Sequence, residues 1–72
     1  MKTLYDVQQL LKSFGIIVYV GSRLYDIEMM GIELKKIYQH QLIDQKTFYT
    51  ATLILRREHR LEEKRAEEND PF

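Results

Sequence analysis

One stretch decides the fold: residues 22–44 read SRLYDIEMMGIELKKIYQHQLID. Apolar side chains recur in it every three or four residues, which is the spacing of one face of an α-helix. That face holds Leu24, Ile27, Met30, Leu34, Ile37 and Tyr38. Ser22 stands where a helix N-cap is expected, and Asp44 is a natural N-cap for another helix. The spacing therefore predicts one helix from Ser22 to about His40 and a second helix that starts after Asp44.

The helix after Asp44 is predicted to be long and to run to about Ala66 or beyond. Its apolar side holds Phe48, Ala51, Ile54, Leu55 and Leu61. Only a few residues connect it to the helix before it, so the two helices should form an antiparallel hairpin. Gly31 lies in the middle of the first of these helices, where glycine costs about 1 kcal/mol relative to alanine. We therefore expect another helix to approach closely at Gly31.

Upstream of this hairpin, residues 4–14 predict an amphipathic helix. Its apolar positions are Leu4, Val7, Leu11 and Phe14. Thr3 can cap this helix, with Asp6 three residues later, and Gly15 suits the left-handed position after its last turn. Residues 16–20 read IIVYV, a β-branched and aromatic run typical of a strand, but no other segment of the chain reads as a strand. We expect residues 16–21 to form an extended connector packed on the helices, or a strand that pairs with a second copy of the chain.

The predicted fold class is all-α: a compact three-helix domain, with the helix of residues 4–14 packed across the hairpin. We expect the domain to span residues 1–66 and residues 67–72 to form a flexible charged tail. This boundary reflects composition, because Leu61, Ala66 and Phe72 are the only hydrophobic residues after Leu55.

Composition restricts the classes of function. The 72 residues include no Cys, so disulfides and thiolate metal sites are excluded. Eleven Lys and Arg balance eleven Asp and Glu, so nucleic acid can be attracted only by cations gathered on one face. No apolar run approaches the roughly 18 residues of a membrane helix. We expect a cytoplasmic protein without a membrane partner.

Cations do gather on one face of the long predicted helix. On a helical wheel at about 100° per residue, one arc of about 100° holds a mostly basic set. The arc contains Lys46, Tyr49, Leu53, Arg56, Arg57, Arg60, Lys64 and Glu67. Arginines that neutralise phosphates, beside rings that stack on unpaired bases, suit a single-stranded nucleic acid. The alternative is a solvated face whose cations pair with nearby glutamates, for instance Arg60 with Glu63.

Arg23 is expected to extend this basic arc. The antiparallel hairpin places the start of its helix level with the second half of the arc, and Tyr19 and Tyr25 flank it as possible stacking rings. The same helix N-terminus presents free amides that suit an anion, although Asp26 would repel one. An ordinary cap by Ser22 is the alternative to an anion site.

A second stripe of apolar side chains lies on the helix that follows Ser22. It consists of Tyr25, Met29 and Ile32, continued by Lys36. If the helix contacts both of its neighbours, the stripe belongs to the core. The alternative is an exposed patch that binds a partner protein or a second copy, for which Met and Tyr are favoured residues.

The residues offer no catalytic constellation. The chain has no glycine-rich phosphate loop and no nucleophile beside a base, and a domain of this size has little room for a ligand cavity. His59 has metal-ligand spacing to Glu62 and Glu63, but such neighbours arise by chance in a charge-rich helix. We expect no enzyme activity, metal, cofactor or small-molecule substrate.

Several separated blocks of this sequence resemble one family. The blocks are Tyr5–Leu11, Gly21–Leu24, Asp26–Met30, Leu42–Asp44 and Leu53–Arg56. Together they resemble the YqgQ-like family of small bacterial proteins, a domain of unknown function, over roughly residues 3–60. The resemblance implies a compact all-helical fold in a bacterial cytoplasm and single-stranded nucleic-acid binding. It supplies no catalytic residues.

The sequence therefore predicts a non-catalytic module that binds single-stranded DNA or RNA. The predicted phosphate-binding residues are Arg23, Arg56, Arg57, Arg60 and Lys64, and the predicted stacking residues are Tyr19, Tyr25 and Tyr49. The alternative prediction is a protein-interaction adaptor or homodimer that uses Tyr25, Met29 and Ile32.

Overall fold

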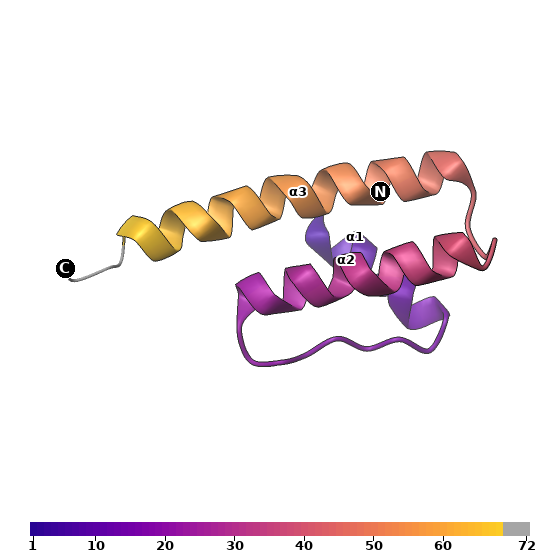
Figure 1. Cartoon of the computed structure of the whole chain (residues 1–72), viewed down its shortest axis with the longest axis horizontal. Helices are drawn as coiled ribbons and strands as arrows, with labels where there is room; N and C mark the ends of the chain where they lie inside the picture. Colours follow the sequence, from indigo (N-terminus) through magenta and orange to yellow (C-terminus); the bar gives the residue numbers. More distant parts are fainter. Residues whose placement is uncertain (69–72) are drawn as a thin grey trace.

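The protein is a bundle of three helices, shown as a computed structural model in Figure 1. The structure describes residues 1–68. The helices are α1 (Leu4–Ser13), α2 (Arg23–Gln39) and α3 (Gln45–Glu68). α2 and α3 lie side by side and antiparallel, and α1 lies behind them and contacts both. The predicted all-α class, the hairpin and the position of the first helix are confirmed.

The core lies where the apolar faces of the three helices meet. Its buried members are Leu4, Val7, Leu11, Ile27, Met30, Leu34, Ile37, Ala51, Ile54 and Leu55. Tyr38 near the end of α2 stacks on Phe48 in the first turn of α3, with ring centroids 4.1 Å apart, and so closes the hairpin. Apolar spacing thus predicted most of the core correctly.

The predicted apolar side of α3 extends too far, because Leu61 is exposed. α3 has 24 residues and α2 has 17, so the C-terminal turns of α3 project beyond the start of α2 and have no helix to pack against. α3 also continues through Glu68, two residues into the predicted tail of residues 67–72. The rest of that tail, residues 69–72, lies outside the described residues.

The ends of α1 form as predicted. The hydroxyl of Thr3 accepts a hydrogen bond from the backbone N–H of Asp6, and the Asp6 carboxylate accepts one from the backbone N–H of Thr3, which completes a capping box. At the other end Gly15 has φ +79°, and its N–H donates to the carbonyl of Lys12 while Ile16 N–H donates to that of Leu11. This pair of bonds is a Schellman motif, which ends the helix.

The N-terminus of α2 differs from the prediction. Ser22 is the N-cap residue, but its side chain makes no capping hydrogen bond. Instead the carboxylate of Asp26 accepts a hydrogen bond of 2.6 Å from the backbone N–H of Val20. This bond ties the end of the connector to the first turn of α2, and it holds a negative charge where an anion would have to bind.

The connector, residues 16–21, is extended and contains no strand, in agreement with the first of the two predicted alternatives. Its side chains alternate in direction. Ile16 and Val18 pack against the core, whereas Ile17 and Tyr19 are 78% and 83% exposed. The connector crosses back along the outside of α2 (Figure 1).

The expectation of a tight helix approach at Gly31 is wrong. A Cβ atom built on Gly31 would lie 4.0 Å from Cδ1 of Leu55, an ordinary van der Waals distance. The glycine is therefore not needed to avoid a clash, and its missing side chain instead leaves space between α2 and α3.

Candidate nucleic-acid interface

α3 is the element that carries most of the candidate site, and its start is fixed locally. The carboxylate of Asp44 accepts a hydrogen bond of 2.8 Å from the backbone N–H of Thr47. Hydrogen bonds from the side chain and the backbone of Thr47 hold the pKa of Asp44 below its ordinary value. The predicted N-cap is confirmed, and it fixes where α3 begins.

The outward face of α3 presents a row of polar and basic side chains with two large apolar ones. Tyr49, Leu53, Arg56, Arg60 and Lys64 are all exposed. The hydroxyl of Tyr49 accepts a hydrogen bond of 3.0 Å from the side-chain amide of Gln45, which fixes the ring near the start of the row. We call these five residues the basic face.

The arginines of the basic face are available to a ligand. Among the side chains that the structure describes, none forms an ion pair with Arg56, Arg60 or Lys64. The predicted alternative in which Arg60 pairs with Glu63 does not occur, because Glu63 contacts His59.

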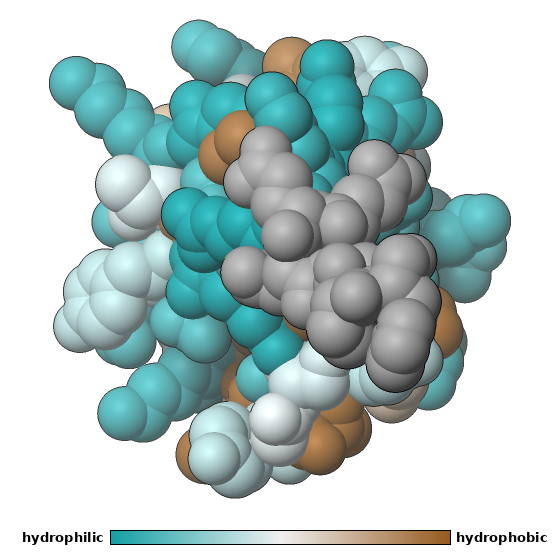
Figure 2. All heavy atoms as spheres, turned by 90° about the vertical axis from the view of Figure 1, so that its left-hand side faces the viewer, coloured by the Kyte–Doolittle hydropathy of each residue, from teal (hydrophilic) through white to brown (hydrophobic). Residues whose placement is uncertain are grey.

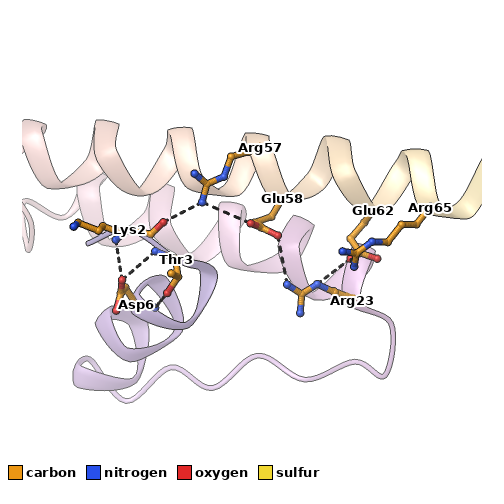
Figure 3. A network of polar contacts seen from close by, with 8 residues as sticks. All are labelled: Lys2, Thr3, Asp6, Arg23, Arg57, Glu58, Glu62 and Arg65. Carbon is orange, nitrogen blue, oxygen red and sulfur yellow. Dashed lines mark hydrogen bonds and ion pairs between the residues drawn. The ribbon is translucent and has the colours of Figure 1, made fainter.

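Arg23 is bound by carboxylates instead of extending the basic face. Its position was predicted correctly, since it lies level with the second half of α3 (Figure 3). However, Nε of Arg23 lies 2.9 Å from Oε1 of Glu62, and its Nη2 lies 3.4 Å from Oε2 of Glu58. Both carboxylates are largely shielded, with side chains 14% and 17% exposed, so the guanidinium is a bridge between α2 and α3.

Arg57 also has intramolecular partners. Its Nη2 donates a 3.0 Å hydrogen bond to the backbone carbonyl of Lys2 and lies 3.7 Å from Oε1 of Glu58 (Figure 3). Arg57 therefore joins α3 to the segment before α1.

His59 connects α2 and α3 beside the basic face. Its Nε2 lies 3.0 Å from Glu28 of α2, and its Nδ1 lies 2.6 Å from Glu63 of α3. The hydrogen bond to Glu28 and the nearby charge of Glu63 raise the pKa of His59 above 6.5, against the opposing effect of desolvation. The imidazole therefore links α2 to α3 through Glu28 and Glu63, and these contacts are stronger when His59 is protonated. We call this set of contacts the His59 clasp.

An open groove of about 330 Å³ lies between α2 and α3, lined by residues of these two helices only. Gly31, Phe48 and Leu55 contribute its apolar lining, and the exposed cations Lys35 and Arg56 stand beside them. Sequence reasoning missed this groove. Gly31 was the available signal, but a glycine inside a helix does not reveal whether a neighbouring helix approaches or leaves a gap.

Two of the predicted stacking residues lie away from the basic face. Tyr19 is on the connector, and Tyr25 is on the outer side of α2, where the surface hollow beside it is lined by Val20, Glu28, Met29 and Ile32. Of the three predicted tyrosines, only Tyr49 lies on α3 with the arginines.

The apolar stripe on α2 is exposed. Tyr25, Met29 and Ile32 are all accessible, so the expectation that α2 buries them against a second neighbour is wrong. The three-helix arrangement places both α1 and α3 on the other side of α2. Seen from the end where α2 begins, most of the surface is hydrophilic, and hydrophobic residues gather along the lower edge, on the side of the connector (Figure 2).

No set of His, Asp and Glu side chains among those that the structure describes is arranged to hold a metal ion. None of the described helices combines the length and the apolar character that crossing a membrane requires.

The comparisons with known proteins agree with one another. The family model described as YqgQ-like matches residues 1–61. The chain is also 50% identical over 58 residues to a protein of Bacillus subtilis (strain 168) named "Uncharacterized protein YqgQ", and the match covers 81% of this chain and 82% of that protein. The chain belongs to the YqgQ-like family.

Proposed function

We propose that the protein is a non-catalytic cytoplasmic module that binds single-stranded DNA or RNA along the basic face of α3. The observation that carries the proposal is that Arg56 and Arg60 project into solvent without a carboxylate partner among the described residues. The other two arginines of the predicted site, Arg23 and Arg57, are bound within the protein and serve to orient α3.

The arrangement of the basic face suits an extended polyanion. Tyr49 and Lys64 are separated by about 22 Å along the helix, at about 1.5 Å per residue. Guanidinium groups bind phosphate oxygens and release counterions, and an exposed tyrosine ring stacks on an unpaired base. The groove beside Arg56 adds an apolar lining from Phe48 and Leu55, with Lys35 on its other side.

The proposal predicts salt-dependent binding of short oligonucleotides. Fluorescent single-stranded DNA and RNA of about 16 nucleotides would be titrated at two salt concentrations, with anisotropy as the signal. For single strands, the logarithm of the affinity falls against the logarithm of the salt concentration by about 0.7 per phosphate contact. The variant Arg56→Ala/Arg60→Ala should bind every sequence more weakly, and its slope should be smaller by about 1.4.

A matched control separates the basic face from overall charge. Lys12→Ala/Lys36→Ala removes the same two charges from α1 and from the outer side of α2. This control should retain the affinity and the salt slope of the original protein. Equal losses in the two double variants, or no binding at low salt, would refute the proposal.

Exposure of the α2 stripe favours a second candidate function, a protein-interaction adaptor that uses Tyr25, Met29 and Ile32. Exposed Met and Tyr are enriched at protein interfaces, and a contiguous apolar patch of this kind marks a contact surface. Met29→Glu/Ile32→Glu should abolish the association with a partner while the helix content by circular dichroism stays unchanged. Loss of helix content instead would assign the two residues to the core.

A further inference from the structure

Residues 16–19 of the connector have the side-chain geometry of a β-strand, but no other strand of the described chain pairs with them. Its side chains alternate, with Ile16 and Val18 toward the core and Ile17 and Tyr19 toward solvent. This alternation is the geometry of a β-strand that has one face on a core.

The main chain of the connector is held at both ends and open in the middle. Ile16 N–H donates to the carbonyl of Leu11, and Val20 N–H donates to the carboxylate of Asp26. Between these two anchors, the N–H and C=O groups of Ile17, Val18 and Tyr19 have no hydrogen-bond partner within the part of the chain that the structure describes. The segment is already extended (Figure 1). Because it is extended before it pairs, it loses little conformational entropy when it pairs with another strand.

The connector also lacks the features that protect an exposed strand edge. Residues 15–22 read GIIVYVGS and include no charged residue and no proline, the usual devices against edge-to-edge pairing. The whole chain has a formal net charge of zero, so two copies do not repel each other at long range. Both properties favour a second copy of this chain as the occupant of the edge.

We infer that two copies of the protein associate by antiparallel pairing of their connectors, around a two-fold axis at Val18. Residues that face each other across such a pair lie on the same face of the ribbon. An axis at Val18 pairs the open main-chain groups of Ile17 and Tyr19 and sets Ile17 of one copy opposite Tyr19 of the other, twice. Pairs of an aromatic and a β-branched residue are favourable across antiparallel strands. The inner face of the ribbon already rests on the two cores through Val18 and Ile16.

Sedimentation equilibrium tests this inference. The weight-average mass should rise with concentration from 8.7 kDa toward twice that value. Ile17→Lys/Tyr19→Lys places lysines opposite each other across the axis, so this variant should stay at the monomer mass. Both residues are exposed, so its circular dichroism should be unchanged.

A matched control carries the same added charge elsewhere. Tyr49→Lys/Leu53→Lys replaces an aromatic and an aliphatic residue that are exposed on α3, and it should associate like the original protein. A monomer at every concentration up to about 1 mM overturns the inference. Loss of association in the control, or its persistence in Ile17→Lys/Tyr19→Lys, overturns it as well.

Cysteine cross-linking tests the register independently of the lysine variants. The chain has no native Cys. Under mild oxidation, a mixture of Ile17→Cys and Tyr19→Cys proteins should form the mixed disulfide in preference to either homodimer. Leu53→Cys serves as the exposed control and should form no disulfide-linked dimer. Equal amounts of the mixed and homodimeric products would contradict the register.

Discussion

Two helices of this protein end in the same way with different residues. Gly15 and Gln41 both adopt positive φ, +79° and +61°, immediately after α1 and α2. Gln41 N–H donates to the carbonyl of Tyr38, and Leu42 N–H donates to that of Ile37, so α2 also ends in a Schellman motif. Glycine adopts this conformation without strain, whereas a residue with a Cβ does so at a cost of about 1 kcal/mol.

Gln41→Gly should therefore stabilise the protein by about 0.5–1 kcal/mol, because it removes the left-handed strain and keeps both hydrogen bonds. Urea unfolding followed by circular dichroism measures the change. Gln41→Ala is the matched control, since it shortens the side chain and keeps the Cβ, and it should not stabilise. A glycine variant that is less stable than the alanine variant would contradict this account of the α2 terminus.

Gly31→Ala should also stabilise the protein, by about 1 kcal/mol, because alanine is the better helix former. The new methyl group would meet Leu55 at ordinary contact distance, so no packing strain offsets this gain. The midpoint of thermal unfolding should rise. A fall would show that α2 and α3 approach more closely at Gly31 than the structure indicates.

Local signals predicted the helix ends where one residue type determines the geometry. Thr3 with Asp6, Gly15 and Asp44 are such positions, and each occupies its predicted place. Gln41 could not be predicted, because its conformation follows from the reversal of the chain and not from its own preference. The position of Ser22 as the N-cap residue was predicted correctly, but its side chain makes no capping hydrogen bond. Asp26 instead joins the connector to α2 at this end.

At the scale of elements, charged side chains join the helices. Arg23 of α2 binds Glu58 and Glu62 of α3, and Glu28 of α2 binds His59 of α3. These contacts flank the part of the hairpin where the apolar core ends and α3 continues alone. One partner of each pair is about half exposed, Arg23 at 52% and Glu28 at 48%, so each pair contributes little individually and its main effect is to fix the rotation of α3 about its axis.

The His59 clasp should make stability depend on pH above the ordinary histidine value of 6.5. Contact with Glu28, and secondarily with Glu63, raises the pKa of His59, so the protonated form is favoured in the folded state. Its contribution is therefore fully present below pH 6.5 and is lost as the pH rises through the raised value. His59→Gln should lose this dependence and keep a hydrogen-bonding side chain.

Urea unfolding of the original protein and of His59→Gln, at a pH below 6.5 and at a pH above the raised pKa of His59, measures the difference in pH dependence. The original protein should lose more stability than His59→Gln as the pH rises. The caps act in the opposite direction, since the pKa values of Asp6 and Asp44 are lowered and their contribution is lost as the pH falls below 3.8. Identical profiles of the two proteins above pH 6.5 would refute the clasp.

The positions of the helices could be predicted from the sequence more completely than the contacts between them. Hairpin geometry placed Arg23 level with the second half of α3. On the same helical wheel at about 100° per residue, Glu58 and Glu62 lie on the core-facing half of α3, outside the basic arc. Their pairing follows from these two facts together, because carboxylates on the inner side of α3 face the start of α2. The groove beside Gly31 depends on how far apart the two helices pack, which periodicity does not specify.

At the scale of the whole molecule, a neutral chain separates its charges by face. The carboxylates of Glu58 and Glu62 point inward to Arg23, whereas Arg56 and Arg60 point outward from α3. Inward pairing of the acidic side chains leaves the outward cations without local neutralisation. The net charge of zero therefore conceals a basic surface, which is the feature on which the nucleic-acid proposal depends.

Amide chemical-shift mapping with a short single-stranded oligonucleotide tests the proposal most directly, because it locates the contact on the molecule. The proposal predicts perturbations along the outer side of α3 that centre on Arg56 and Arg60 and weaken as salt is added. Perturbations confined to the outer side of α2 or to the connector, or none at low salt, would contradict it.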